Sequence, residues 1–228
     1  MDALFSNRTD AGAALAERLL EYAGRSDVLV LALPRGGVPV AFPVAFALCA
    51  PLDVFLVRKV GVPGYEELAL GAIASGGVRV VNEEVRREID LPDDVIDALA
   101  AREGLELRRR ELYYRGERPL PAVRGRIVIL IDDGLATGAT MRAAVLALRQ
   151  MEPAKLIVAV PVAAPETCET LRREADQVVC LATPDPFLAV GAWYADFSQT
   201  SDEEVTALLE QARRRMERDD AITIIDRS

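Results

Sequence analysis

The chain has 228 residues, of which 51% are hydrophobic and 28% are charged, and its formal net charge is −9. This length allows one large α/β domain or two small ones, with a sizeable buried core. The acidic balance argues against a nucleic-acid-binding protein, which needs a basic face. Because the chain contains no histidine, histidine-based catalytic triads and most zinc sites are excluded.

The cysteines and the apolar segments bear on location. Cys49, Cys168 and Cys180 are far apart and lie in apolar contexts, so we expect reduced core thiols in a cytoplasmic protein. The first ten residues, MDALFSNRTD, lack the charged lead and the apolar segment of a signal peptide. The longest apolar stretch, 38–52, is too short to span a bilayer, so no membrane association is expected.

Short apolar runs alternate with helical patterns along the chain, which indicates an α/β fold with a parallel sheet. The apolar runs that predict strands are 27–33, 52–57, 126–131, 155–162 and 177–182. Helices are predicted over 9–22, 38–49, 140–151, 164–175 and 201–215. Thr9 is the expected cap of the first helix, and Ser201 with Glu204 forms a capping box for the last. The tail AITIID is expected to add a strand or to remain loose.

Two segments interrupt this alternation. Residues 58–77 are rich in glycine and contain one proline, which predicts a long, mobile loop that leads into a short strand. A helix-rich insertion covers about 83–118, and Asp93 and Asp94 lie in the first turn of its second helix, where the helix dipole favours acidic side chains.

The stretch VILIDDGLATGAT, residues 128–140, contains the most informative pattern. A buried strand ends in Asp132 and Asp133, and a loop of small residues then leads into a helix. Backbone N–H groups of 136–140 can converge on a phosphate at the helix N-terminus. Two carboxylates beside a phosphate are reasonable if they face neutral hydroxyls or a cation, so a phosphorylated sugar with magnesium explains both features. The alternative is a solvated aspartate pair followed by an ordinary turn.

This stretch resembles the phosphoribosyl diphosphate signature of the type I phosphoribosyltransferase family. The resemblance implies a parallel sheet flanked by helices, with a hood and a flexible loop. It also implies one domain over 1–228, with a core at about 25–82 and 124–200 and a C-terminal helix over about 201–215. Asp132 and Asp133 would meet the ribose hydroxyls, with Asp133 also near Mg²⁺. The residues expected to hold the 5-phosphate are Ala136, Thr137, Gly138, Ala139 and Thr140.

Two basic segments fit the same resemblance. The turn LPRGG, residues 33–37, would contact diphosphate through Arg35 and Gly36, often with a non-proline cis peptide in this family. Arg58 and Lys59 open the glycine-rich segment and would neutralise the leaving diphosphate. For each segment the alternative is an ordinary turn or solvated surface charge.

The segment FLAVGAWYADF, residues 187–197, resembles the hood that covers a nucleobase. Val190 and Gly191 could expose main-chain groups to the base edge, and Trp193, Tyr194 or Phe197 could stack on it. A small satellite core of aromatic residues is an equally reasonable interpretation. Glu66 and Glu67, on the predicted lid, could accept a proton from the acceptor, although solvated surface glutamates explain them as well.

The resemblance predicts magnesium-dependent transfer of 5-phosphoribosyl from phosphoribosyl diphosphate to a nitrogen acceptor, a nucleobase, with release of diphosphate. Ala136 stands where 6-oxopurine transferases carry an aspartate, so the loop is most similar to the adenine type. The partners are then small molecules, and the chain would form a homodimer. The alternative is a regulator that binds phosphoribosyl diphosphate or a nucleotide without turnover. A phosphoribohydrolase or phosphatase would need a positioned water and base, and the sequence offers no candidate for them.

Overall fold

The computed structural model describes residues 3–62, 65–88 and 92–225. Five parallel strands form the central sheet, in the order β2-β1-β6-β7-β8. Their bounds are Leu52–Val54 (β2), Val28–Ala32 (β1), Ile127–Ile131 (β6), Lys155–Val162 (β7) and Gln177–Ala182 (β8). β1 and β6 are buried along their whole length, as expected for strands covered on both faces. The α/β fold class with a parallel sheet is therefore confirmed.

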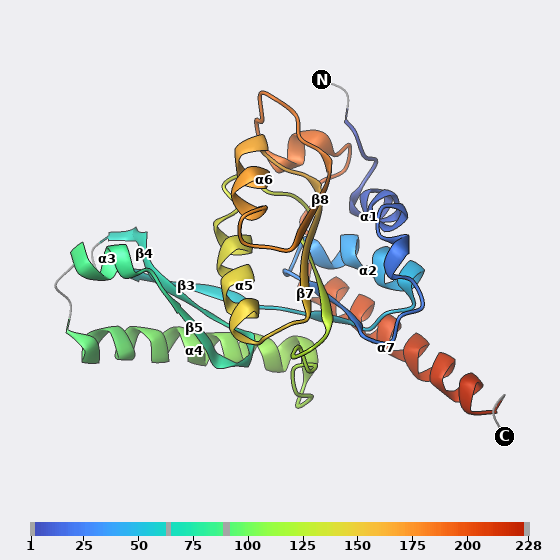
Figure 1. Cartoon of the computed structure of the whole chain (residues 1–228), viewed down its shortest axis with the longest axis horizontal. Helices are drawn as coiled ribbons and strands as arrows, with labels where there is room; N and C mark the ends of the chain where they lie inside the picture. The colour runs from blue at the N-terminus through green and yellow to red at the C-terminus, as the bar shows by residue number, and fades with distance from the viewer. Residues whose placement is uncertain (1–2, 63–64, 89–91, 226–228) are drawn as a thin grey trace.

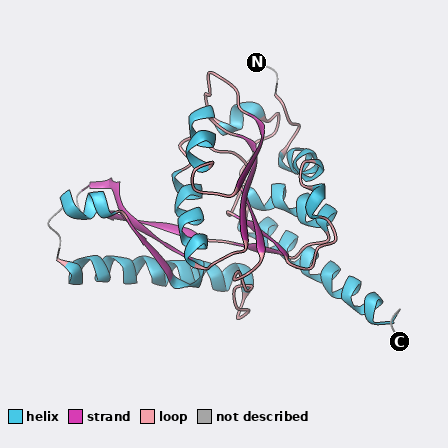
Figure 2. Cartoon of the chain, viewed as in Figure 1, coloured by secondary structure: helices cyan, strands magenta, loops and turns pink. Residues whose placement is uncertain are grey.

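Helices cover both faces of this sheet (Figures 1 and 2). One layer contains α1, α2 and α7, and the other contains α5 and α6. Their bounds are Arg8–Glu17 (α1), Gly37–Leu48 (α2), Asp202–Ile225 (α7), Ala139–Gln150 (α5) and Pro165–Leu171 (α6). Short 3-10 turns lie at Leu20–Tyr22, Ser75–Gly77 and Val190–Trp193. No helix in the described part of the chain is both long and apolar enough to cross a bilayer.

The prediction of a mobile loop over 58–77 is wrong, because this segment forms most of a second sheet. Strands β3 (Val57–Val62), β4 (Tyr65–Ala74) and β5 (Val78–Val81) pair antiparallel. Gly71 belongs to β4 because a side chain has no room there: a Cβ atom would lie 2.2 Å from the Val80 carbonyl oxygen. The glycines of this segment therefore permit close strand pairing as well as turns.

The predicted helical insertion is confirmed as α3 (Glu83–Glu88) and α4 (Asp93–Arg115). Helix α4 packs against the second sheet, and the two project together from one side of the central sheet (Figure 1). The buried Leu107 and Ala100 of α4 join Val60 and Ile73 of the sheet in the main hydrophobic cluster. The insertion thus supports the second sheet. The division into one domain with the core bounds given above stays a prediction.

Three local predictions need correction. Asn7 caps α1 instead of Thr9, because its side chain accepts a hydrogen bond from the Asp10 backbone N–H. Helix α7 begins at the predicted cap, where the Ser201 hydroxyl accepts from the Glu204 N–H. It continues to Ile225, however, so the helix is longer than 201–215, and the described part of the tail, 221–225, is helical instead of a strand or a loose end.

The prediction of three reduced core thiols is also wrong. Cys168 and Cys180 are joined as a disulfide, and Cys49 is exposed near the end of α2. Cys168 lies in α6 and Cys180 in β8, the strand at the edge of the central sheet. The predicted cytoplasmic location loses the support of reduced thiols and stays a prediction.

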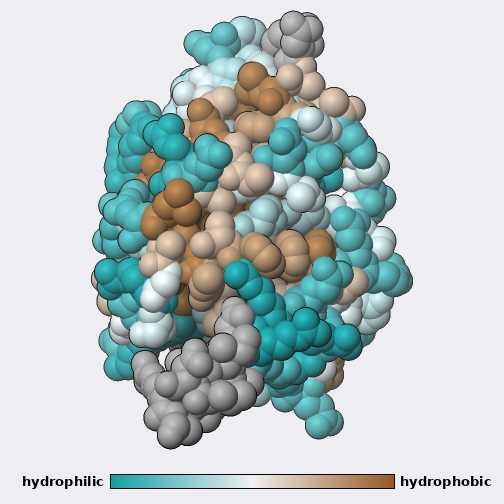
Figure 3. Space-filling view, turned by 90° about the vertical axis from the view of Figure 1, so that its right-hand side faces the viewer, coloured by the Kyte–Doolittle hydropathy of each residue, from teal (hydrophilic) through white to brown (hydrophobic). Residues whose placement is uncertain are grey.

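The face formed by α1, α2 and α7 carries small apolar areas separated by polar side chains (Figure 3). Phe46 of α2 is one of the exposed large apolar residues. The Arg215 guanidinium of α7 lies 3.4 Å above the ring of Phe46 and covers part of it. A cavity of about 150 Å³ lies between α2 and α7 beside this contact.

Candidate functional site

The acid pair, Asp132 and Asp133, directly follows β6 at the carboxyl edge of the central sheet. The Asp133 backbone N–H donates to Oδ1 of Asp132 over 2.9 Å. Burial raises the pKa of Asp132 well above its ordinary value, and the negative charge of Asp133 raises it further. Burial also raises the pKa of Asp133, against a lowering effect of Arg8. The surroundings of the acid pair thus disfavour the ionised form of both carboxyl groups.

Arg8, which the sequence interpretation did not identify, is the cation beside this pair. Its Nε donates to Oδ2 of Asp133 over 2.8 Å, and its Nη1 donates to the Ser198 carbonyl over 2.7 Å. The guanidinium also lies 3.9 Å above the centre of the Phe197 ring. Arg8 is at the start of α1 and Asp133 is 125 residues away in sequence, so no local pattern could have indicated the pair.

The turn 33–37 packs against the acid pair. The Pro34–Arg35 peptide is cis, as the family resemblance implies. A Cβ atom on Gly36 would lie 2.0 Å from Oδ2 of Asp133, and one on Gly37 would lie 2.7 Å from the Ile131 carbonyl. Glycine is therefore required for the turn to approach the acids this closely. Arg35 is half-buried and, within the described residues, its guanidinium has no hydrogen bond or ion pair.

The loop 136–140 leads into the first turn of α5. Gly138 adopts a left-handed conformation at the N-cap, with φ of 68°, and no side chain caps the helix. The Thr167 hydroxyl donates to the Ala136 carbonyl over 2.6 Å and fixes the loop from the α6 side. Ala136, Thr137, Ala139 and Thr140 are exposed. A helix N-terminus with an open first turn has the geometry that favours a phosphate group.

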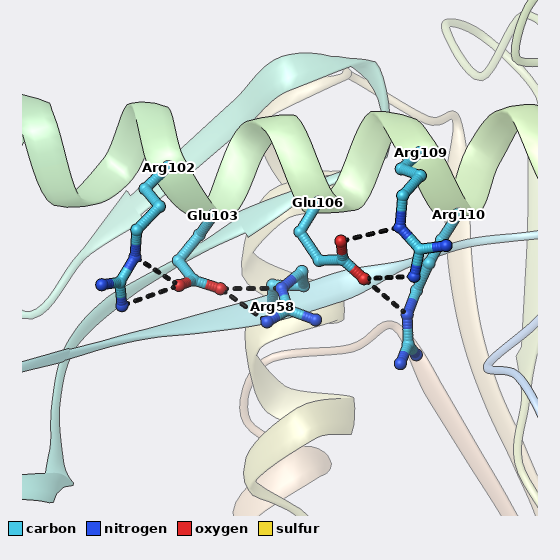
Figure 4. Close-up of polar contacts among 6 residues, drawn as sticks. All are labelled: Arg58, Arg102, Glu103, Glu106, Arg109 and Arg110. Carbon is cyan, nitrogen blue, oxygen red and sulfur yellow. Dashed lines mark hydrogen bonds and ion pairs between the residues drawn. The ribbon is translucent and has the colours of Figure 1, made fainter.

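Arg58 and Lys59 lie on β3, in the second sheet, and not on a loop. The Arg58 guanidinium pairs with Glu103 of α4, with a shortest distance of 2.7 Å, and Arg102 contacts the other oxygen of that carboxylate (Figure 4). Lys59 is exposed. The structure thus gives Arg58 a partner outside the acid-pair region, and the role of both residues on diphosphate stays a prediction. The backbones of Glu66 and Glu67 lie in β4, but their side chains are outside the part that the structure describes.

Of the predicted hood residues, Trp193 and Tyr194 are buried, and Val190 packs against the loop that follows the acid pair. Trp193 and Tyr194 are buried in a small aromatic cluster with Ala11 and Val162. The Tyr194 hydroxyl donates to the Asp133 carbonyl over 2.5 Å. Val190 lies over Gly134, where a Cβ atom would come within 2.5 Å of its Cγ1. The burial of Trp193 and Tyr194 favours the satellite-core interpretation, and base contact by these residues and Val190 stays a prediction.

Three predicted parts of the site therefore meet at one edge of the sheet: the acid pair, the turn with Arg35 and Gly36, and the open loop 136–140. Magnesium is commonly held by one or two carboxylates together with substrate phosphates. The two carboxylates fit that mode of binding, because each keeps one oxygen that accepts no hydrogen bond from another described residue. Within the described residues no cluster of three or more acidic or cysteine side chains could hold a metal by itself.

Comparison with known proteins agrees with this geometry. The sequence profile of the family described as "Phosphoribosyl transferase domain" matches residues 2–193. A protein of Mycobacterium tuberculosis strain H37Rv that is named a phosphoribosyl transferase is 50% identical over 212 residues. The alignment covers 92% of this chain and 47% of that protein, so the chain spans about half the length of this relative.

The structural comparison gives a second close match. The crystal structure of the protein TT1426 from Thermus thermophilus superposes with a TM-score of 0.80 at 48% identity, and the match covers 90% of this chain and 97% of that one. The acid pair, the loop 136–140 and the turn 33–37 all fall within the span that the family profile matches. The chain belongs to the phosphoribosyl transferase domain family.

Proposed function

We propose that the chain transfers a 5-phosphoribosyl group from phosphoribosyl diphosphate to the nitrogen of a nucleobase in a magnesium-dependent reaction that releases diphosphate. The observation that carries this proposal is the open loop 136–140 at one sheet edge, next to two carboxylates that each keep one oxygen without a hydrogen bond from another described residue. The loop would hold the 5-phosphate, and Asp132 and Asp133 would accept hydrogen bonds from the vicinal ribose hydroxyls.

The remaining residues would act on the leaving group and the acceptor. The guanidinium of Arg35, which has no partner among the described residues, would face the diphosphate and stabilise the charge that develops as the glycosidic bond breaks. Mg²⁺, bound to diphosphate and beside Asp133, would neutralise part of that charge. Catalysis would then depend on position and electrostatics, which suits a site without histidine.

The proposed acceptor is a nucleobase whose binding does not require an acidic side chain at position 136 of the protein. Ala136 is exposed and offers only its main chain to a ligand in the loop. The partners would be phosphoribosyl diphosphate and this small molecule, with no nucleic acid and no membrane. A homodimer is also proposed. It is supported by the exposed Leu105, Leu112 and Tyr113, which lie within one sector of α4.

A non-catalytic regulator that binds phosphoribosyl diphosphate or a nucleotide is the second candidate. One observation favours it: the segment expected to be a water-excluding lid is a paired sheet, and Arg58 is bound to Glu103. The loss of the lid removes an argument for turnover without affecting the ligand-binding residues.

One experiment separates the two candidates. The protein, Mg²⁺ and phosphoribosyl diphosphate are mixed with a panel of nucleobases, and diphosphate release is followed. Release that depends on one base supports the transferase and identifies the acceptor. Binding of phosphoribosyl diphosphate by calorimetry without release for any base would support the regulator, and absence of binding would exclude both.

A further inference from the structure

We infer that Arg8 is a positioning residue of this site, which joins the acid pair to the hood and prepares Asp133 for ribose. The inference rests on the proposed function and extends the site to the N-terminal segment 4–8, which lies outside the core implied by the resemblance. Its basis is the set of contacts that Arg8 makes in three directions.

The first observation is the way the guanidinium is held. The Arg8 side chain is 12% exposed and touches three partners: the Asp133 carboxylate, the Ser198 carbonyl and the Phe197 ring. An arginine with a charged acceptor, a neutral acceptor and an aromatic face around it has little freedom left. Phe197 is the last residue of the hood, Ser198 directly follows it, and Asp133 follows the central strand β6, so Arg8 links the end of the hood to the acid pair.

The second observation is the attachment of the backbone that carries Arg8. The N–H groups of Leu4 and Phe5 both donate to the Trp193 carbonyl, over 2.9 and 3.1 Å. In return the N–H groups of Ala195 and Asp196 donate to the carbonyls of Phe5 and Ser6, over 2.8 and 2.9 Å. The N-terminal segment thus pairs with the hood along its length before α1 begins.

The start of α1 is fixed as well. The Asn7 side chain accepts from the Asp10 N–H, and the Asp10 carboxylate accepts from the Ser6 N–H, each over 2.9 Å. This reciprocal pair of caps holds the first turn in which Arg8 lies. Arg8 is therefore presented to Asp133 by a rigid element and not by a flexible terminus.

The third observation concerns the carboxylate oxygens of the acid pair to which Arg8 does not donate. It occupies Oδ2 of Asp133, and the Asp133 N–H occupies Oδ1 of Asp132. The other oxygen of each carboxylate accepts no hydrogen bond from another described residue. The two remaining oxygens would serve the two vicinal hydroxyls of ribose. One guanidinium beside two carboxylates also reduces their repulsion of a phosphorylated ligand.

Gly36 shows that the contact is built into the site. Its α-carbon faces the ion pair so closely that a Cβ atom would lie 2.0 Å from Oδ2 of Asp133 and 3.2 Å from Nε of Arg8. The turn expected to contact diphosphate therefore packs on the same two atoms that form the ion pair. A displacement of Arg8 would disturb the ribose and diphosphate parts of the site together.

The test compares Arg8→Ala, Arg8→Lys and a matched control, Arg18→Ala, in the full chain. Arg18 is an exposed arginine at the other end of α1. The probe is phosphoribosyl diphosphate with Mg²⁺, measured by calorimetry and by the KM for each substrate. We expect Arg8→Ala to weaken binding about 10- to 100-fold, as for loss of an interaction with a charged group. Arg8→Lys should recover part of this, and Arg18→Ala should bind like the wild type.

Further readouts separate positioning from folding. A positioning role predicts that the KM for phosphoribosyl diphosphate rises while the KM for the base stays unchanged, and that added guanidinium at low millimolar concentration partly restores Arg8→Ala. If Arg8→Ala does not fold, Arg8→Lys alone must show weaker binding than the wild type. A wild type that binds the probe and Arg8 variants that bind it equally well would overturn the role of Arg8. A wild type that does not bind it would overturn the proposed function itself.

Discussion

The carboxylates of the acid pair differ from Glu103 and Glu106 of α4 in the number of arginines beside them, and from Glu106 in the direction of their pKa shifts. Along α4, Glu103 faces Arg58 and Arg102, while Glu106 faces two further arginines (Figure 4). In the acid pair a single arginine, Arg8, forms an ion pair with Asp133 and lies near Asp132. The pKa of Glu106 is lowered to about 2, mainly by its hydrogen bond with Arg109, whereas the pKa values of both aspartates are raised by burial. Each of these two glutamates of α4 thus meets two arginines, whereas the acid pair has one arginine beside it.

The largest expected loss of stability is at the C-terminal end of α4, where the ion pair between Arg115 and Asp53 is buried. Arg115 is 4% exposed; its Nε contacts both carboxylate oxygens of Asp53 at 3.1 Å, and its Nη2 donates to the Val54 carbonyl. Arg115→Ala leaves Asp53 without its charged partner and with only the Val54 N–H as a donor among the described residues, so we expect a loss of about 3–5 kcal/mol of unfolding free energy. Chemical denaturation measures this value.

The control for Arg115 is Arg109→Ala, which removes an arginine that is 70% exposed from the same helix. Solvent screens an exposed pair of this kind, so Arg109→Ala should change the unfolding free energy far less than Arg115→Ala does. Equal losses for the two variants would contradict the distinction between buried and exposed ion pairs of α4.

A substitution in the acid pair is expected to have a smaller effect on the unfolding free energy, and to raise it. Because the folded-state pKa of Asp132 is raised, its ionised form costs stability at neutral pH, and this cost falls as the pH is lowered through the folded pKa. Asp132→Asn keeps an oxygen for the Asp133 N–H and should raise the unfolding free energy by on the order of 1 kcal/mol. The same variant should weaken phosphoribosyl diphosphate binding about 10-fold or more.

Asp133→Asn is the matched variant. It removes the same charge but also the ion pair with Arg8, so it should lose ligand affinity without a gain in stability. Thermal denaturation and calorimetry on both variants measure the two quantities. If Asp132→Asn is less stable than the wild type at neutral pH, the acid pair is compensated in a way that these contacts do not explain.

The smallest expected effect is the pH dependence that Glu106 supplies. Because its pKa is lowered from 4.5 to about 2, its stabilising contribution is present above about pH 4.5 and is lost as the pH falls towards 2. Glu106→Gln should therefore reduce the acid sensitivity of unfolding in this window and change little else. Glu117→Gln, at an exposed position of the following loop, should leave the acid sensitivity unchanged. Urea titrations at several pH values would show whether the two variants differ.

The sequence predicted the central sheet and most of the acid-pair region well, for a local reason. Continuous apolar runs such as 155–162 are typical of strands covered on both faces, and the signature 128–140 lies within one strand, one loop and one helix start. The hairpin of β3 and β4 was missed because its glycines indicate a loop when only the sequence is known. In the fold, Gly71 provides room for the neighbouring strand.

Other features depend on contacts that no local pattern contains. Arg8 meets Asp133 through the packing of α1 against the hood, and the partner of Arg58 is 45 residues away on α4. The aromatic residues of 187–197 could be base-stacking or core residues from sequence alone. The packing of Trp193 with Phe187, Phe5 and Val162 in one cluster distinguishes these possibilities better than composition can.

The pairing of residues 4–6 with the hood has a practical consequence for anyone who purifies this protein. These residues pair with 193–196 and lead into Arg8, which contacts Asp133, so an affinity tag, a fusion partner or a short deletion at the amino end would act close to the proposed ligand-binding region. Tagging at the carboxyl end of α7, which projects away from the hood (Figure 1), avoids that interference. Weak ligand binding in an amino-terminally tagged preparation would therefore say little about the untagged protein.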